Sequence, residues 1–200
     1  AEDHNHNIWL ATRKGLYKID ERNNVQLMFN DVLKNAVINY LFEDSKNNFW
    51  IGTYSGLYRL ENDQLVIYRP DIINKDTYIN HIYEDSGNLI WVSTNEGLIK
   101  IENEELELLN QKNGLGDNTT RWVHEDYEKN IWIGTDNGVD VFVDKQFVLF
   151  TEPNKISDSW CIYEDENGRI LVGLEYGGVK ELRDGKLLDV EEFKELNKRT

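Results

Sequence analysis

The sequence predicts an all-β fold built from repeated four-stranded units, and three observations support this prediction. One eight-residue pattern recurs as IWLATRKG, FWIGTYSG, IWVSTNEG and IWIGTDNG, with a weaker fifth copy, ILVGLEYG. Short runs of β-forming residues alternate with turn residues throughout the chain. The tryptophans of the four stronger copies are spaced by 41 residues each time, at Trp9, Trp50, Trp91 and Trp132. A fixed period of this length, with four strands per repeat, is typical of a β-propeller blade.

The third copy shows the expected strands most clearly. We denote the strand positions A to D, from the inner to the outer edge of a blade, and expect them over Ile79–Asp85, Leu89–Thr94, Leu98–Glu102 and Leu106–Leu109. Ser86-Gly87-Asn88 separates A from B, and Asn95-Glu96-Gly97 separates B from C, and both have turn chemistry. A helical solenoid would instead need apolar residues at i, i+3 and i+4 over long stretches.

The repeats divide the chain into five units, at about 1–36, 37–77, 78–118, 119–157 and 158–200. The first unit opens at Ala1-Glu2-Asp3, which aligns only with the end of strand A, so we expect it to hold strands B, C and D. The next three units are complete, and the fifth begins near Asp158 and ends with strand D over Lys186–Val190.

Five B–C–D sets with four strands A predict a single propeller domain or fragment that is part of a larger ring. Blades pack face against face, and an incomplete ring therefore exposes apolar surface and an unpaired strand edge. A closed five-bladed ring is the alternative, because five periods of 41 residues nearly account for the 200 residues of the chain.

The composition excludes several classes of partner. The net charge is -15 and the sequence pI is about 4.7, which argues against nucleic acid and against an anionic membrane surface. No apolar run reaches the roughly 18 residues of a membrane-spanning helix, and we expect neither a signal peptide nor direct membrane insertion in this segment. The single cysteine excludes an internal disulfide.

The repeated residues are interpreted as structural, because a catalytic residue is needed once and an architectural residue in every blade. Trp9, Trp50, Trp91 and Trp132 are expected to bury their rings between neighbouring sheets. A glycine in each turn between B and C is expected at positive φ: Gly15, Gly56, Gly97, Gly138 and Gly177. Four threonines are expected to hydrogen-bond across the same turn: Thr12, Thr53, Thr94 and Thr135.

The repeated carboxylate pairs suggest acid–base or metal chemistry, but a turn role is the better interpretation. Glu43-Asp44, Glu84-Asp85, Glu125-Asp126 and Glu164-Asp165 all fall at one position, between strands A and B. An aspartate there can accept backbone N–H groups of the turn. The pattern loosely resembles the Asp-box of sialidase propellers, but the spacing differs and no sialidase activity is inferred.

The residues that vary between blades are the candidates for ligand binding. Tyr54, Asn95, Asp136 and Tyr176 occupy the turns between B and C, and Arg121 and Trp160 occupy the early part of strand A, which lines the central channel of a propeller. This set suits hydrogen bonding to, and stacking on, a polar neutral or cationic ligand such as a sugar. The alternative, for each of these residues, is that it belongs to a solvated rim and binds no ligand.

The sequence contains no identifiable catalytic residues, metal site or cofactor motif. His4 and His6 lie in an expected exposed turn without identifiable partner ligands. Cys161 is predicted to be a small buried residue of strand A, and His81 and His124 are expected in packed blade faces. Gly177-Gly178 belongs to a turn rather than to a phosphate-binding loop.

The units INHIYEDSGNLIWVSTNEGLIKI and INYLFEDSKNNFWIGTYSGLYRL resemble the two-component regulator propeller repeat. Asn113-Gly114-Leu115 also matches the N-G-L that this family often carries before strand A. The resemblance covers nearly the whole chain. It implies the extracytoplasmic sensor part of a bacterial hybrid histidine kinase, with paired seven-bladed propellers, an immunoglobulin-like domain, a membrane span and cytoplasmic kinase modules. This chain departs from that pattern, since it has about five blades and no downstream module.

Three functional hypotheses follow. The first is a non-enzymatic periplasmic sensing module that recognises an oligosaccharide or similar polar ligand on one propeller face. The second is a protein docking or dimerisation scaffold, with other propeller blades or a second copy of the chain as the partner. The third is a propeller glycan hydrolase or lyase, and the absence of a non-repeated carboxylate or histidine constellation argues against it.

Overall fold

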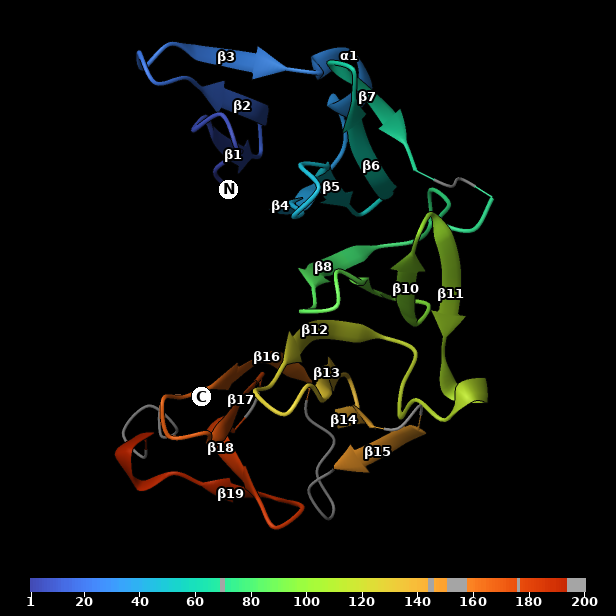
Figure 1. Cartoon of the computed structure of the whole chain (residues 1–200), viewed down its shortest axis with the longest axis vertical. Coiled ribbons are helices and arrows are strands. Elements are labelled where there is room, and N and C mark those ends of the chain that lie inside the picture. The colour runs from blue at the N-terminus through green and yellow to red at the C-terminus, as the bar shows by residue number, and fades with distance from the viewer. Residues whose placement is uncertain (69–70, 144–145, 151–157, 176, 194–200) are drawn as a thin grey trace. The chain divides into compact units, whose positions relative to one another are not determined.

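The computed structural model describes residues 1–68, 71–143, 146–150, 158–175 and 177–193, and within these ranges the chain forms five antiparallel sheets (Figure 1). The predicted all-β propeller fold is confirmed, and we call the sheets blades one to five in chain order. The chain divides into two compact units, Ala1–Glu84 and Asp85–Thr200, which are described separately.

The first unit contains blade one, blade two and the inner strand of blade three. Blade one is three-stranded and consists of β1 (Ile8–Thr12), β2 (Gly15–Ile19) and β3 (Val25–Met28). The short helix α1 (Asn30–Leu33) follows it. Blade two has four strands in sequential order, β4 (Ile38–Glu43), β5 (Phe49–Thr53), β6 (Gly56–Glu61) and β7 (Gln64–Ile67). β8 (Ile79–Glu84) ends the unit.

The second unit contains the rest of blade three and blades four and five. Blade three has the order β11-β10-β9-β8, with β9 (Ile90–Thr94), β10 (Leu98–Glu102) and β11 (Glu105–Leu109), and the 3-10 turn η1 (Gln111–Asn113) follows. Blade four has β12 (Thr120–Glu125), β13 (Ile131–Thr135), β14 (Gly138–Val143) and β15 (Gln146–Phe150). Blade five has β16 (Ser159–Glu164), β17 (Ile170–Leu174), β18 (Gly178–Arg183) and β19 (Lys186–Asp189), and η2 (Glu191–Phe193) follows.

The strand positions agree closely with the prediction. Strand C of the third unit has the expected bounds, and the other three strands of that unit differ by one residue at one end. Blade one lacks strand A as predicted, since Glu2 makes only an isolated bridge to Ile8. Each predicted repeat from residue 37 onward contains the strands of one sheet. That the repeats together make one domain stays a prediction.

Three of the repeated tryptophans pack against the next sheet: Trp9, Trp91 and Trp132. Trp9, Trp50 and Trp91 are each 2% exposed, and Trp132 is half-buried. In the first unit, Trp9 packs with Phe49 of blade two, with ring centroids 4.8 Å apart. Burying an aromatic ring of this size removes a large apolar area from water, so this contact holds one sheet against the next.

An aspartate organises each turn between strands A and B, as predicted. In blade two, Asp44 Oδ1 accepts the backbone N–H of Lys46 at 3.0 Å and of Asn48 at 2.8 Å. Its Oδ2 accepts the indole N–H of Trp50 at 2.9 Å. The same indole bond, at 2.7–2.8 Å, recurs in three further pairs: Asp3–Trp9, Asp85–Trp91 and Asp126–Trp132. The aspartate therefore fixes both the turn and the ring that packs on the next blade.

Blade five keeps this turn without its tryptophan. Leu171 stands at the tryptophan position, and Arg169 Nε donates to Asp165 Oδ2 at 2.7 Å. The backbone N–H groups of Asn167 and Arg169 bind Asp165 Oδ1, each at 2.9 Å. The guanidinium thus replaces the indole as the donor to this carboxylate.

The glutamate of each repeated pair links consecutive blades. Glu84 accepts the backbone N–H of Ser45 at 2.7 Å, and Glu125 accepts that of Ser86 at 2.8 Å. Glu43, Glu125 and Glu164 stand at the position of Glu84 in the other blades. Of these, Glu43 contacts His4, and Glu164 accepts the backbone N–H of Tyr127. These carboxylates therefore have a structural role, in agreement with the prediction for the pairs.

The predicted turn chemistry between strands B and C is also confirmed. The repeated glycines have φ values between +105° and +143°, which L-residues rarely adopt. Gly97 shows a second requirement, because a Cβ at this position would lie 2.4 Å from the carbonyl oxygen of Leu109. The repeated threonines each donate to the carbonyl of the turn glycine, as Thr94 does to Gly97 at 2.7 Å.

The prediction that Cys161 is buried is wrong, because its side chain is exposed on β16. Within the described residues, β16 packs against β12 and β13 and pairs with β17. Residues of β16 that point away from these strands remain in solvent, and Trp160 and Tyr163 are 53% and 61% exposed. By contrast, His81 at the equivalent position of β8 is 2% exposed and contacts Tyr40.

Candidate functional site

Three of the six predicted ligand-contacting residues come together in the second unit. Arg121 belongs to β12, Asp136 to the turn between β13 and β14, and Trp160 to β16. The guanidinium of Arg121 binds Asp136 through two hydrogen bonds, Nε to Oδ1 at 2.6 Å and a terminal nitrogen to Oδ2 at 3.1 Å. Its central carbon lies 5.5 Å from the centre of the Trp160 ring. We call this group the rim cluster.

β-Bulges place the two strand residues of the rim cluster. The register of β12 shifts between Thr120 and Trp122, and that of β16 shifts between Ser159 and Cys161. Arg121 and Trp160 are therefore the extra residues of their strands, and a bulge re-aims the side chain that it carries. The backbone N–H of Asp136 donates to Thr119 at 3.1 Å, which fixes the turn beside the start of β12.

Two further carboxylates complete the rim cluster. Asp158 Oδ2 lies 3.6 Å from a terminal nitrogen of Arg121. The backbone N–H of Glu175 donates to the carbonyl of Asp158 at 2.9 Å, and the Glu175 carboxylate lies close enough to act on the charges of both Asp158 and Arg121. Three carboxylates thus surround one guanidinium.

The charges of the rim cluster are coupled. Burial and repulsion from Asp136 raise the pKa of Asp158, and Arg121 opposes this effect. Burial disfavours the charged form of Arg121, but the hydrogen bond and charge of Asp136 outweigh burial and raise its pKa. The guanidinium therefore stays charged, and the rim cluster carries excess negative charge at neutral pH.

The chemistry of the rim cluster suits a polar ligand. Trp160 offers an indole face that is half exposed to solvent, and the carboxylates offer acceptors for hydroxyl and ammonium groups. Arg121 is already bound by Asp136 on its Nε side, so it serves mainly to hold the carboxylate and to flank the indole. Stacking and accepting groups side by side can bind a neutral or cationic sugar.

The other predicted ligand residues lie elsewhere. Tyr54, 43% exposed in the turn between β5 and β6, stacks on Tyr78 with ring centroids 5.4 Å apart, within the first unit. Asn95 is half-buried in the turn between β9 and β10. Tyr176 lies outside the residues that the structure describes.

The sequence interpretation missed Asp158 and Glu175 as members of the rim cluster, and Tyr78 as the partner of Tyr54. A signal was present for Asp158, because the residue just before strand A is Val37, Tyr78 or Thr119 in the other complete blades. A charge at a position that is uncharged in three blades marks a departure from the repeat.

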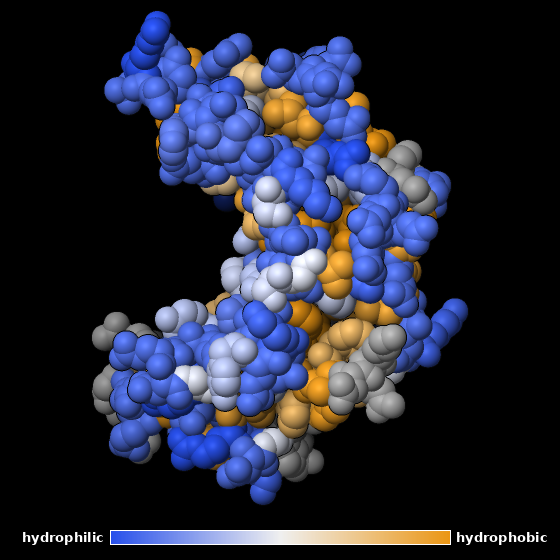
Figure 2. Space-filling view, viewed as in Figure 1, coloured by the Kyte–Doolittle hydropathy of each residue, from blue (hydrophilic) through white to orange (hydrophobic). Residues whose placement is uncertain are grey.

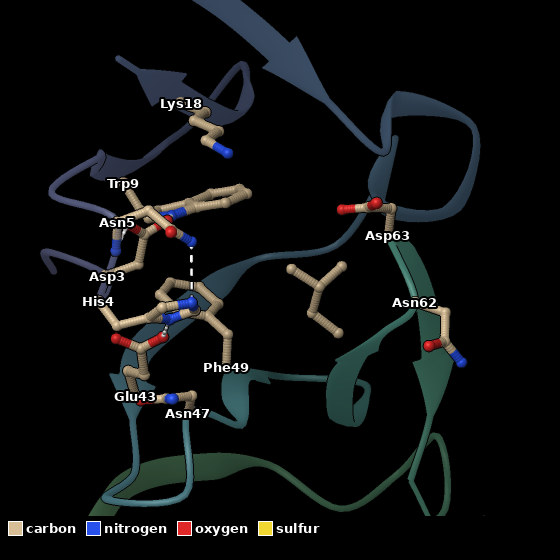
Figure 3. Close-up of a pocket in the computed structure, with 11 residues that line it drawn as sticks. Asp3, His4, Asn5, Trp9, Lys18, Glu43, Asn47, Phe49, Asn62 and Asp63 are labelled. Carbon is tan, nitrogen blue, oxygen red and sulfur yellow. Dashed lines mark hydrogen bonds and ion pairs between the residues drawn. The ribbon is translucent and has the colours of Figure 1, made fainter. Parts of the chain in front are cut away.

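A second polar cavity, of about 310 Å³, lies between blades one and two (Figure 3). His4 contacts Glu43 through Nδ1, and its Nε2 accepts a hydrogen bond from the side-chain amide N–H of Asn5 at 2.9 Å. The ammonium of Lys18 lies 5.3 Å from the centre of the Trp9 ring, and Asp63 faces them from the loop between β6 and β7. The His4–Glu43 contact shows that this histidine, for which no partner was identified in the sequence, has a structural partner.

Blade four contains a buried carboxyl group that the sequence interpretation also missed. Asp140 on β14 is 0% exposed, and its Oδ1 accepts the backbone N–H of Gly116 at 3.1 Å. Its Oδ2 is buried without a hydrogen-bond partner. Burial, together with the nearby charge of Asp117, raises the pKa of Asp140 to about 7.

Within the described residues, no group of three or more His, Cys, Asp and Glu side chains is arranged to hold a metal ion. His6 contacts Glu2 at 2.8 Å, and His4 contacts Glu43. None of the helices in the described part of the chain is long and apolar enough to cross a membrane.

The resemblance to the two-component regulator propeller is confirmed by comparison with protein families. The family described as "Two component regulator propeller" matches residues 32–55 and 114–137. These matches cover strands A and B, with the turn between them, in blades two and four. No curated protein matches the sequence.

Solved structures share the fold. One is the extracellular domain of BT4673 from B. thetaiotaomicron, assigned as a hybrid two component system, with 21% identity, a TM-score of 0.73 and coverage of 92% of this chain. Another is virginiamycin B lyase from Staphylococcus aureus, with 12% identity, a TM-score of 0.72 and coverage of 96% of this chain and 69% of the lyase. The chain spans 29% of the BT4673 domain, and these likenesses show the propeller fold alone.

Proposed function

We propose that this chain is part of a non-enzymatic sensing module of a two-component signalling protein, located in the periplasm. The family match and the likeness to extracellular domains of two component systems support this proposal. In this role, the repeated residues form the scaffold, and residues that differ between blades recognise the ligand.

The proposed ligand is a neutral or amine-bearing oligosaccharide bound at the rim cluster. The single observation that carries the proposal is the arrangement of Arg121, Asp136 and Trp160, which departs from the repeat and combines an exposed indole with carboxylates. The excess of carboxylates over cations favours hydroxyl or ammonium groups and disfavours uronic or sulfated sugars. The face of the molecule in Figure 2 is mostly hydrophilic, which agrees with a net charge of -15.

Calorimetric titration with a panel of neutral, amine-bearing and acidic oligosaccharides tests this proposal. We expect Trp160→Ala to weaken binding of the best neutral or amine-bearing ligand at least tenfold, about 1.4 kcal/mol. Tyr163→Ala is the matched control, because Tyr163 is also an exposed aromatic residue of β16, 61% exposed against 53% for Trp160, and lies outside the rim cluster. Equal effects of the two substitutions, or preference for acidic sugars, would contradict the proposal.

The likeness to virginiamycin B lyase favours a second candidate, a propeller enzyme, only at the level of the fold. The rim cluster itself supports binding rather than turnover, because Asp136 is held by Arg121 in two hydrogen bonds and is a poor candidate for a free base. Chemical conversion of an oligosaccharide that is lost on Arg121→Ala but kept on Tyr163→Ala would revive the enzyme hypothesis.

A further inference from the structure

Three blades place an aromatic ring beside their repeated tryptophan, from the last residue of strand D or from the residue just after it. Phe29 stacks on Trp9 with centroids 6.5 Å apart, and Phe150 stacks on Trp132 at 6.0 Å. Tyr68 meets Trp50 edge-on at 4.8 Å and is itself 4% exposed. The end of strand D therefore normally fills the space beside the tryptophan with a ring.

Blade three is the exception. The register pairs Leu98 with Leu109, as it pairs Val139 with Phe150 in blade four, so Leu109 occupies the position of the ring. Trp91 has a different ring neighbour, Phe142 of blade four, at 5.9 Å. A leucine is shorter and narrower than a phenylalanine or tyrosine, and the space beside Trp91 is accordingly not filled by blade three itself.

The missing ring leaves a cavity of about 460 Å³ in the second unit, which we call the blade-three pocket. Its apolar walls are formed by Trp91, Leu109, Phe142 and Phe147, and its charged rim by Lys100 and Glu107. Phe142 and Phe147 pack together at 4.9 Å and so form one continuous wall. The volume and the combination of apolar walls with a few polar groups are those of ordinary ligand pockets.

Two carboxylates, Glu107 and Glu102, and one ammonium, Lys100, lie at or beside the rim of this pocket. The ammonium of Lys100 is already paired with Glu102 at 2.9 Å. Glu107 is exposed and forms no ion pair within the described part of the chain. With a net charge of -15 on the whole chain, the pocket should attract a basic partner and repel an acidic one.

We propose that the blade-three pocket is a docking site for an aromatic side chain, flanked by basic residues, of a partner polypeptide. The other blades show which group fits beside the tryptophan, namely a phenyl or phenol ring. β11 is the outermost strand of its sheet, so its free edge can pair with the backbone of the bound segment. The ring enters the pocket, and Glu107 binds the flanking cation.

The proposal is tested by titrating the protein with the acetylated and amidated tripeptide lysyl-phenylalanyl-lysine. The same tripeptide with alanine in the centre is the control for charge alone. We expect the aromatic peptide to bind at one site per chain, at least tenfold more tightly than the alanine peptide. We also expect the indole N–H resonance of Trp91 to shift only with the aromatic peptide.

Two variants locate the site. Leu109→Phe supplies the ring that blade four carries at this position, and we expect the folded variant to lose binding at least tenfold. Leu108→Phe is the matched control, because this neighbouring residue of β11 is exposed and does not line the pocket, and binding should persist. Glu107→Gln should keep ring binding but lose most of its dependence on salt.

Any of three results would overturn the inference. The first is that the unmodified protein does not bind the aromatic peptide, and the second is that it binds the alanine peptide equally well. Alternatively, Leu109→Phe, shown to be folded by its circular dichroism spectrum, binds the aromatic peptide as tightly as the unmodified protein does.

Discussion

At the scale of single residues, the repeated aspartate connects the turn between A and B to the ring that packs on the next blade. Asp85 accepts the backbone N–H of Gly87 and Leu89 through Oδ1, and the indole N–H of Trp91 through Oδ2. One carboxylate therefore satisfies three donors in a site where it is itself 8% exposed. Loss of this acceptor leaves the buried indole N–H and two partly buried backbone N–H groups without their partner, which is more costly than the loss of an exposed hydrogen bond.

Asp85→Ala should lower the free energy of unfolding by about 2–4 kcal/mol, because three donors lose their acceptor. Urea denaturation measures this change. Asp165→Ala is the control, since its carboxylate is bound by Arg169 rather than by a buried indole, and its loss should be smaller. Equal losses for the two variants would show that the indole bond contributes little.

The buried carboxyl group of Asp140 makes stability depend on pH. Its pKa is about 7 in the folded state, against the 3.8 that is ordinary for an aspartate, so the folded state binds the proton more tightly. Stability is therefore highest while the group is protonated in both states. The contribution of Asp140 to stability falls as the pH rises from about 4 to 7, by on the order of 4 kcal/mol, and changes no further above that range.

Asp140→Asn should remove this dependence, because the amide stays neutral at every pH. The gain in stability of the variant over the unmodified protein should be large at pH 8 and should shrink towards pH 4. Urea denaturation across this pH range measures it, with the exposed substitution Asp31→Asn as control. A difference that does not change with pH would refute the assignment of the titration to Asp140.

At the scale of elements, much of the fold could be predicted from the sequence. The 41-residue period, the alternation within Ile79–Glu84 and the turn glycines locate strands to within about a residue, because these signals act over short distances. The indole bond spans six residues, and the glutamate contact to the previous blade spans 37–39 residues. The indole bond lies within one blade at a spacing that recurs in four repeats, whereas no local pattern specifies the glutamate contacts, which form only when blades pack.

The rim cluster could be predicted in part. Variation between repeats identified Arg121, Asp136 and Trp160, and the structure brings them together. The bulges that aim Arg121 and Trp160 were not predictable, since a bulge depends on the pairing of two strands rather than on one segment. Cys161 was placed wrongly for a related reason, because its exposure depends on what packs over β16.

The end of strand D offers a test of packing at the scale of one blade. Tyr68→Leu should create in blade two the arrangement of blade three and lower the free energy of unfolding by about 2–4 kcal/mol, because a buried ring is lost. Leu109→Phe should not destabilise the protein, because its ring enters existing space. Thermal unfolding measures both. Destabilisation by Leu109→Phe as large as that by Tyr68→Leu would show that the blade-three pocket cannot hold a ring.

At the scale of the molecule, one apolar sheet face stands out. In blade one, Ile8 pairs with Ile19 and Leu10 with Tyr17, and Val25 and Leu27 extend these two rows on β3. Ile8, Leu10, Val25 and Leu27 are 40–64% exposed. At the equivalent positions of blade two, Phe49 and Ile51 are 3% and 0% exposed, because blade one covers them.

This exposed face predicts that the chain associates with itself in solution. Light scattering should show a mass that rises with concentration, since contiguous apolar surface favours burial against another molecule. Leu10→Lys combined with Leu27→Glu should reduce this association. A strict monomer at all concentrations, or association that is unaffected by the two substitutions, would contradict the prediction.

The central claim is that repeated residues hold the blades together and that residues departing from the repeat bind the ligand. The most direct test follows the indole N–H resonances of the six tryptophans while a neutral or amine-bearing oligosaccharide is added. We predict that the resonance of Trp160 moves, while those of the four indoles bound to aspartate stay in place: Trp9, Trp50, Trp91 and Trp132. Movement of these four with an unchanged Trp160 would contradict the claim.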